Sequence, residues 1–338
     1  MLKPPATSDL LADPVPFQRK LKEWFRKSGK SYPWRETTDP YKILVSEVML
    51  QQTTIASVLK NQFFTRFIER YPTTAELAQA SEEELLSLWE GLGYYSRARN
   101  LKKAAEIIEN EHGGIFPQDW EALNALPGVG PYTAGAVASF AFGQRKGLVD
   151  GNVHRVFARL MDYRKEVDSA EGVAQMWEWA EHLVPEEEPG AYNSALMELG
   201  QTVCSRTRPD CVVCPVSEFC KTRTPLELPT KKPRVRSTSQ EENVIFYQDK
   251  DGRVLLEQEQ GSRRKGMWKL PTSDDESGQL LHTQNYVITR YKVKMRVFAG
   301  GFMEGENLKL FTREEIKTLP MPSPYRRALN TLVMTGDK

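Results

Sequence analysis

The sequence contains no cysteine outside one short window. Its four cysteines lie within residues 204–220, spaced as C-x6-C-x2-C-x5-C, and are Cys204, Cys211, Cys214 and Cys220. Four thiols gathered in a chain otherwise free of cysteine indicate a shared ligand, and a metal centre is the natural candidate. Zinc and an iron–sulfur cluster both accept four cysteines, so physical chemistry alone leaves the two open.

Long apolar runs are also absent. No stretch of eighteen apolar residues occurs, which argues against a transmembrane helix. The first residues, Met-Leu-Lys-Pro-Pro, lack the apolar stretch of a signal peptide. We therefore expect a cytoplasmic protein with no membrane partner, a compartment where clustered thiols bind metal more readily than they pair. At 338 residues, 40% of them hydrophobic, the chain should form two or three domains with cores.

A strong net charge is lacking as well, because 46 Lys and Arg residues balance 45 Asp and Glu residues. This balance hides opposed segments. Residues 164–198 carry nine carboxylates against two cations, whereas residues 221–240 carry six cations against one carboxylate. A DNA-binding interpretation must therefore rest on local basic patches, not on overall charge.

Helix signals recur through residues 15–223, which we predict to be almost entirely helical. They combine capping residues, prolines in first turns and glycines after last turns. The signals are Asp39-Pro40 before an apolar run at 41–50, a capping box of Ser81 and Glu84, and a helix over 97–111 that ends at Gly113-Gly114.

The last third of the chain has a different pattern. Residues 224–240 are rich in proline and charge, which predicts an extended linker. Residues 241–338 show short alternating runs between Gly and Asp turns, which predict a separate, mostly β domain that ends in a helix. The expected strands are 242–247, 253–257, 285–289 and 291–298, with the helix near 325–333.

The segment LPGVGPYTAGA, residues 126–136, has the pattern of two helices joined by a glycine-containing turn. The helices are predicted over 120–126 and 132–142. Glycine removes side chains where the backbone must approach a partner, and N–H groups at the start of the second helix can hold a phosphate. Such a turn would position DNA without reading its sequence. An ordinary tight turn is the alternative.

Two carboxylates lie in contexts that suit catalysis. Glu47 is the one carboxylate of an otherwise apolar helix, so burial would raise its pKa and suit a general acid, unless an arginine such as Arg35 neutralises it. Asp150, in VDGNVHR, either caps the next helix or takes part in catalysis. Two carboxylates of unlike environment can break a glycosidic bond, such as the bond of a flipped nucleobase to deoxyribose. Gln51-Gln52 and GLGYY at 91–95 are candidate wedges for the gap left in the duplex, and ordinary helix-turn packing is the alternative.

Together these segments resemble the MutY family of adenine DNA glycosylases, within the helix-hairpin-helix superfamily that includes endonuclease III. The resemblance covers about residues 17–335. Its motifs are PWR (33–35), SEVMLQQT (46–53), WEGLGYYSRARNL (89–101), LPGVGPYTAGA (126–136), VDGNVHRV (149–156), ALMELG (195–200) and the four cysteines.

The resemblance implies a role for each matching residue. Glu47 would protonate adenine, Asp150 would stabilise or capture the sugar cation, and Tyr132 and Asn152 would position these groups. The cysteines would ligate a 4Fe–4S cluster. Adenine contacts are implied for Arg35, Trp34 and Glu198, and DNA contacts for Gln52, Tyr94, Leu92, Gly128, Val129 and Gly130.

Tyr132 separates two kinds of glycosylase. Relatives of endonuclease III carry a lysine at the matching position, which forms a Schiff base and allows strand cleavage. Tyrosine cannot form one, so we expect a monofunctional enzyme. The alternatives are an endonuclease III-like glycosylase/lyase and a non-catalytic DNA-damage binding protein.

Residues 241–338 look like the MutT-like domain with which this family recognises 8-oxoguanine opposite adenine. The segment KGMWKLP, residues 265–271, fits that pattern, but no acidic Nudix box is visible. The family's recognition run, Phe-Ser-His, aligns best with Ile288, Thr289 and Arg290, of which Thr289 keeps the hydroxyl.

The expected architecture is thus a helical glycosylase domain with an iron–sulfur loop (1–223) followed by an α+β domain. The expected partner is double-stranded DNA with A:8-oxoguanine or A:G mispairs, bound by a monomer in the nucleoid.

In a strand over residues 291–298, period two predicts that Arg290, Lys292, Lys294 and Arg296 lie on one face. That face would either contact DNA or be an ordinary solvated surface.

Overall fold

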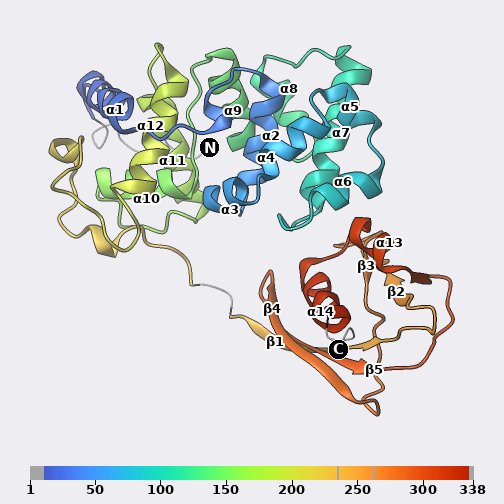
Figure 1. Cartoon of the computed structure of the whole chain (residues 1–338). Coiled ribbons are helices and arrows are strands. Elements are labelled where there is room, and N and C mark those ends of the chain that lie inside the picture. Colours follow the sequence, from blue (N-terminus) through green and yellow to red (C-terminus); the bar gives the residue numbers. More distant parts are fainter. Residues whose placement is uncertain (1–10, 234–235, 262, 335–338) are drawn as a thin grey trace. The chain divides into compact units, whose positions relative to one another are not determined.

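The computed structural model describes residues 11–233, 236–261 and 263–334. It divides into two compact units, one formed by residues up to 51 and 107–233, the other by 52–106 and the chain from 234 onward. The first two thirds of the chain are helical and the strands lie in the last third (Figure 1).

The helical prediction for residues 15–223 is confirmed. None of the described helices is both long and apolar enough to cross a membrane. The helices are α1 (Val15–Ser28), α2 (Pro40–Leu50), α3 (Ile55–Lys60), α4 (Phe63–Arg70), α5 (Thr74–Gln79), α6 (Glu82–Leu88), α7 (Ser96–His112), α8 (Trp120–Ala125), α9 (Pro131–Phe142), α10 (Gly151–Leu160), α11 (Ala170–Leu183) and α12 (Pro189–Thr202), with 3-10 turns at Pro33–Arg35, Ser217–Phe219 and Pro225–Glu227.

The predicted helix ends are largely confirmed. The Asp39 carboxylate accepts hydrogen bonds from the first-turn N–H groups of α2, which begins at Pro40. Ser81 caps α6, as predicted, by accepting from the backbone N–H of Glu84. The Glu84 side chain, however, accepts from Arg70 at 3.2 Å, so the structure gives an ordinary cap where we predicted a capping box.

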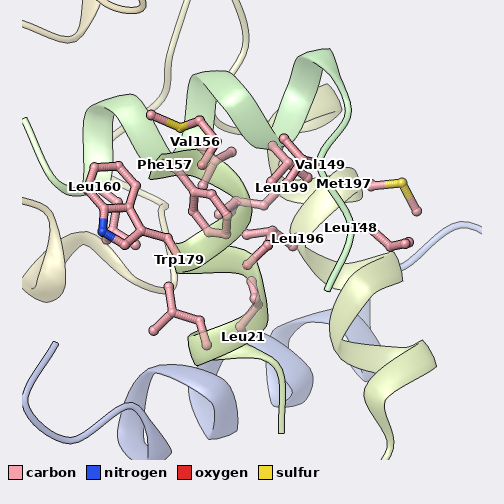
Figure 2. Close-up of a cluster of buried hydrophobic side chains, with 14 of the residues drawn as sticks. Leu21, Leu148, Val149, Val156, Phe157, Leu160, Trp179, Leu196, Met197 and Leu199 are labelled. Atoms are coloured by element: carbon pink, nitrogen blue, oxygen red, sulfur yellow. The ribbon is translucent and has the colours of Figure 1, made fainter. Parts of the chain in front are cut away.

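The first unit is built around α12. This helix packs against α1, α9 and α10, and α2 packs against α9. Apolar side chains of α1, α9, α10, α11 and α12 form one buried cluster, which includes Leu21, Phe157, Trp179 and Leu196 (Figure 2). Burial of this much apolar surface is the main force that holds the helices together.

Strands in the second unit form two small sheets. One has the order β1-β5-β4, with β1 parallel to β5 and β4 antiparallel to it; the other has the order β3-β2-β6. The four predicted strands and the final helix are confirmed, and β3, β6 and α13 were not predicted. The elements are β1 (Thr238–Phe246), β2 (Val254–Gln258), β3 (Trp268–Lys269), β4 (Leu280–Ile288), β5 (Tyr291–Ala299), β6 (Leu308–Phe311), α13 (Arg313–Thr318) and α14 (Ser323–Met334).

The segment expected to be an extended linker, residues 224–240, is not extended throughout. Its 3-10 turn is tied to the first unit by an ion pair of Glu227 with Arg164 at 2.6 Å. The backbone of Thr230 accepts from Val167 at 3.0 Å. Strand β1 then begins at Thr238, inside the expected linker.

Alternation along β5 is confirmed. Val293, Met295 and Val297 are buried, and the cations between them face outward. Arg296 pairs with Glu276 at 2.6 Å and with Glu241 at 3.1 Å, so carboxylates already neutralise this end of the face. This favours an ordinary solvated surface at Arg296.

Candidate active site

Glu47 lies in the middle of α2, where Val45, Val48 and the other neighbours are apolar and buried. Its side chain is itself buried, at 7% exposure. Burial raises the pKa of Glu47 to about 7, while a hydrogen bond from Tyr132 lowers it and the nearby Asp150 carboxylate raises it. Glu47 is therefore a carboxyl group that can hold its proton near neutral pH.

Arg35 does not neutralise Glu47. Its guanidinium donates to the Glu198 carboxylate at 2.7 Å, and of the groups that shift the pKa of Glu47 it has the smallest effect. The aromatic rings of Tyr32 and Phe25 lie against Arg35, at 4.7 and 5.3 Å from ring centre to guanidinium carbon. The structure therefore favours the interpretation of Glu47 as a general acid over that of a carboxylate neutralised by Arg35.

Glu198 supplies a second buried carboxylate to the same unit. Only 1% of its side chain is exposed. One oxygen accepts from Arg35, and among the described residues the other has no hydrogen-bond partner. Trp34, in the preceding 3-10 turn, is buried and stacks on Tyr32 at 5.3 Å. A buried acceptor without a partner is costly, and a donor on a ligand would satisfy it.

Asp150 caps α10, as one of the two interpretations predicted. One carboxylate oxygen accepts from the backbone N–H groups of Asn152 (2.8 Å) and Val153 (2.7 Å). The other accepts from the side-chain amide of Asn152 at 2.8 Å. These bonds fix the orientation of the carboxylate. Capping and catalysis are compatible here, because Asp150 also lies close enough to Glu47 to raise its pKa.

Asn152 is held in place by residues that the sequence did not single out. Arg155, one turn further along α10, donates to the Asn152 amide oxygen at 2.9 Å and to the backbone oxygens of Gly200 (2.6 Å) and Cys204 (2.8 Å). A Cβ atom at Gly200 would lie 2.7 Å from the Cβ of Asn152, so only glycine allows α12 to approach this closely. The i, i+3 spacing of Asn152 and Arg155 was the available signal.

Tyr132, in the first turn of α9, lies close to both carboxylates. Its hydroxyl lies 3.4 Å from the sulfur of Met197 and hydrogen-bonds Glu47. Burial, together with the charges of Glu47 and Asp150, raises the pKa of Tyr132 well above its usual range. The hydroxyl therefore stays protonated and acts as a donor, not as a nucleophile.

The turn between α8 and α9 has the predicted helix-hairpin-helix form. Gly128 adopts a left-handed conformation, with φ of 75°. Gly130 is the N-cap of α9 and Pro131 its first residue. Val129 is only 6% exposed, so this turn would offer a partner its backbone and not the valine side chain.

The cysteine loop follows α12, and all four thiols are free. Burial raises the pKa of Cys214 to about 11, and the other three thiols raise it as well, so the four lie within electrostatic reach of one another. The buried guanidinium of Arg159 lies 3.3 Å from the sulfur of Cys204. Among the described residues no three His, Cys, Asp or Glu side chains form a ready-made metal site. By chemistry alone, four cysteine thiols are the donor set of a four-cysteine centre, but in the described structure they are not arranged as ligands.

Two turns in the second unit carry the candidate wedges. Gln52 and Tyr94 have left-handed backbones, with φ of 58° and 47°, and Tyr94 is 44% exposed. Leu92 is only 6% exposed, so it does not lie on the surface as a DNA contact would require. Arg97, itself buried, donates to the backbone oxygens of Leu92 (2.9 Å) and Gly93 (3.1 Å) and so supports this turn from inside.

The candidate reader of 8-oxoguanine is the turn between β4 and β5. Thr289 is exposed there, with φ of 52°, and its hydroxyl donates to the backbone oxygen of Ile288 at 2.7 Å. Arg290 stacks on Tyr291, with 5.2 Å between guanidinium carbon and ring centre. The Thr289 hydroxyl oxygen keeps lone pairs with which it can accept a further hydrogen bond.

Comparison with known proteins finds similarity to DNA repair enzymes. Residues 45–182 match the model of the HhH-GPD superfamily of base excision DNA repair proteins. The chain is 43% identical over 226 residues to human (Homo sapiens) adenine DNA glycosylase, an alignment that covers 64% of this chain and 41% of the human one. The chain thus spans about two fifths of the length of that relative.

Two solved structures are similar. One, a thermostable thymine-DNA glycosylase, shares 30% identity with a TM-score of 0.56, covering 62% of this chain and 95% of that one. The other is a non-covalent endonuclease III–DNA complex, which shares 28% identity with a TM-score of 0.52 and covers 62% of this chain and 96% of that one.

Proposed function

We propose that the chain is an adenine DNA glycosylase of the HhH-GPD superfamily of base excision DNA repair proteins, whose family model matches residues 45–182. It hydrolyses the N-glycosidic bond of an adenine that has been flipped out of the duplex. The observation that carries the proposal is the pairing of Glu47, whose pKa is about 7, with Asp150, a carboxylate fixed by three hydrogen bonds. Two carboxyl groups with such unlike environments divide the roles of acid and anion.

Glu47 donates its proton to the adenine ring as the C1′–N9 bond breaks and the bonding electrons leave with the base. Positive charge then develops on the sugar, and the Asp150 carboxylate stabilises it. Water adds to C1′ and gives a proton to the Glu47 carboxylate, which restores the acid. Asn152 orients Asp150, and Tyr132 orients Glu47.

Adenine is bound by Arg35, Glu198 and Trp34. The unpartnered oxygen of Glu198 is a buried acceptor, and the exocyclic amine of adenine is a donor that can satisfy it. The ion pair with Arg35 holds the Glu198 carboxylate in place. Trp34 supplies an aromatic face on which the adenine ring can stack.

The enzyme releases the base without cutting the strand. A lyase needs an amine nucleophile, and Tyr132 has a hydroxyl that stays protonated. The likeness to endonuclease III concerns the fold, and Tyr132 is the reason to place this chain among the monofunctional enzymes.

Cys204, Cys211, Cys214 and Cys220 hold a 4Fe–4S cluster with a structural role. When bound, the cluster supplies a rigid anchor for the loop after α12. Arg206 and Arg208 in this loop then face DNA phosphates. The backbone N–H groups of Gly128 and Gly130 hold a further phosphate at the hairpin.

Residues 241–338 form a MutT-like domain that recognises the base opposite adenine, either 8-oxoguanine or guanine. Thr289 and Arg290 are its readers, and Gln52 and Tyr94 enter the base stack. The helical glycosylase domain spans residues 1–223 and the connecting segment spans 224–240. The protein acts as a monomer on nucleoid DNA.

The test measures free adenine released from A:8-oxoguanine, A:G and A:C duplexes in parallel. We expect release from the first two and little from the third, with intact strands until alkali is added. No adenine from any duplex, with tight binding retained, would favour the non-catalytic alternative.

A further inference from the structure

We propose that the ion pair between Glu90 and Arg326 attaches one turn of the chain, the turn that bears Tyr94, to α13 and α14. Arg326 is then a positioning residue for the entry of Tyr94 into the base stack. The inference rests on the proposed function, because it uses Tyr94 as a residue that enters the stack. Both partners lie in the second unit.

The contact between Arg326 and Glu90 is bidentate. Arg326 Nε donates to one Glu90 oxygen at 3.0 Å, and Arg326 Nη2 donates to the other at 2.8 Å. The two side chains are only 17% and 21% exposed, so water screens the pair less than it screens a surface ion pair. A guanidinium matches a carboxylate in this geometry and an ammonium does not.

Arg326 is itself anchored on the C-terminal side. Its guanidinium also donates to the backbone oxygens of Ile316 and Leu319, at the end of α13. All these hydrogen bonds come from the one planar guanidinium group of Arg326. If Glu90 moved away, Arg326 could follow it only by breaking its bonds to Ile316 and Leu319. The pair therefore ties residue 90 to residues 316–319.

On the other side, Glu90 begins the turn that ends at Tyr94. The turn is compact, because Gly91, Gly93 and Tyr94 all adopt left-handed conformations. The backbone oxygen of Gly93 accepts from Trp89 (3.1 Å) and from Arg97 (3.1 Å). These hydrogen bonds make the turn rigid, so the position of Glu90 determines the position of Tyr94.

A second link in the same unit is weaker. It is a single hydrogen bond, from Arg99 to the backbone oxygen of Lys265, with no opposite charge across the link. Glu90–Arg326 is therefore the contact whose loss should loosen the turn.

The experiment compares Glu90→Gln, Arg326→Lys and the double variant with the wild type. Glu84→Gln is the matched control, since it makes the same change in an exposed pair with Arg70. Amide hydrogen exchange of the DNA-free protein reports on residues 89–96. Single-turnover adenine release from an A:8-oxoguanine duplex, at a series of enzyme concentrations, separates binding from bond cleavage.

We expect faster exchange at residues 89–96 in Glu90→Gln. The enzyme concentration for half-maximal release should rise roughly three- to ten-fold, with the saturating rate unchanged. The double variant should match the more affected single variant, because both remove the same interaction. The control should match the wild type.

Unchanged exchange in Glu90→Gln, additive effects in the double variant, or a loss confined to the saturating rate would each overturn the proposal. A wild type that releases no adenine would instead overturn the proposed function, and the exchange measurement would still decide whether the pair holds the turn.

Discussion

Glu47→Gln should make the folded protein more stable at neutral pH while it removes activity. The reason is the raised pKa of Glu47, which is about 7 in the folded protein against an ordinary value of 4.5. Burial is the largest cause, so the folded state resists the loss of this proton. A group of this kind favours the folded state fully below its unfolded pKa, and the advantage is lost as pH rises through the folded pKa.

The size of the effect follows from the shift. Each pKa unit corresponds to about 1.4 kcal/mol, so the full shift is worth roughly 3 kcal/mol across the window from pH 4.5 to pH 7. Between about pH 5 and about pH 8 the wild type should lose roughly 2 to 3 kcal/mol of unfolding free energy that Glu47→Gln does not lose. Any effect of the amide that does not depend on pH cancels in this difference.

The assay is urea unfolding of both proteins at the two pH values. Glu23→Gln, a change of an exposed carboxylate in α1, serves as the control and should follow the wild type. A difference between Glu47→Gln and wild type that is the same at both pH values would refute the reasoning, because Glu47 would then titrate as an ordinary carboxylate.

Three further predictions concern other groups. Replacement of Tyr132 by Lys should allow a covalent DNA adduct to be trapped with borohydride, since a lysine can form a Schiff base; efficient trapping by the wild type would instead support a lyase. Thr289→Val should reduce the preference for A:8-oxoguanine over A:G by roughly ten-fold or more, because one hydrogen bond is lost. Thr283→Val on β4 is the control. An unchanged preference would mean that other residues recognise 8-oxoguanine. Protein purified without oxygen should be brown, with iron and broad absorption near ~400 nm, whereas about one zinc and no iron would contradict the cluster.

Local sequence signals predicted the helices and the burial of Glu47 well. Apolar neighbours on both sides of Glu47 left it no exposed face, and Asp39-Pro40 marked the start of α2. Strands with a clear alternation, such as β5, were equally readable. The missed elements β3 and β6 are short, and their pairing with β2 is what makes them strands. Their own residues give no signal of that pairing.

Pairings between distant residues could not be predicted in the same way. The partner of Arg35 is Glu198, 163 positions away, and only the packing of the first unit brings the two together. Leu92 was predicted to contact DNA from a glycine-rich turn, but the turn folds it inward. The bond of Arg155 to the carbonyl of Cys204 likewise depends on the close approach of α12 to α10.

The central claim is that Glu47 and Asp150 break the glycosidic bond. The most direct measurement is single-turnover release of adenine from an A:8-oxoguanine duplex by wild type, Glu47→Gln and Asp150→Asn, with binding of the same duplex measured alongside. Each substitution removes a proton donor or an anion and keeps the volume, so release should fall by roughly a hundred-fold or more while binding is retained. Release within about ten-fold of wild type by either variant would contradict the account.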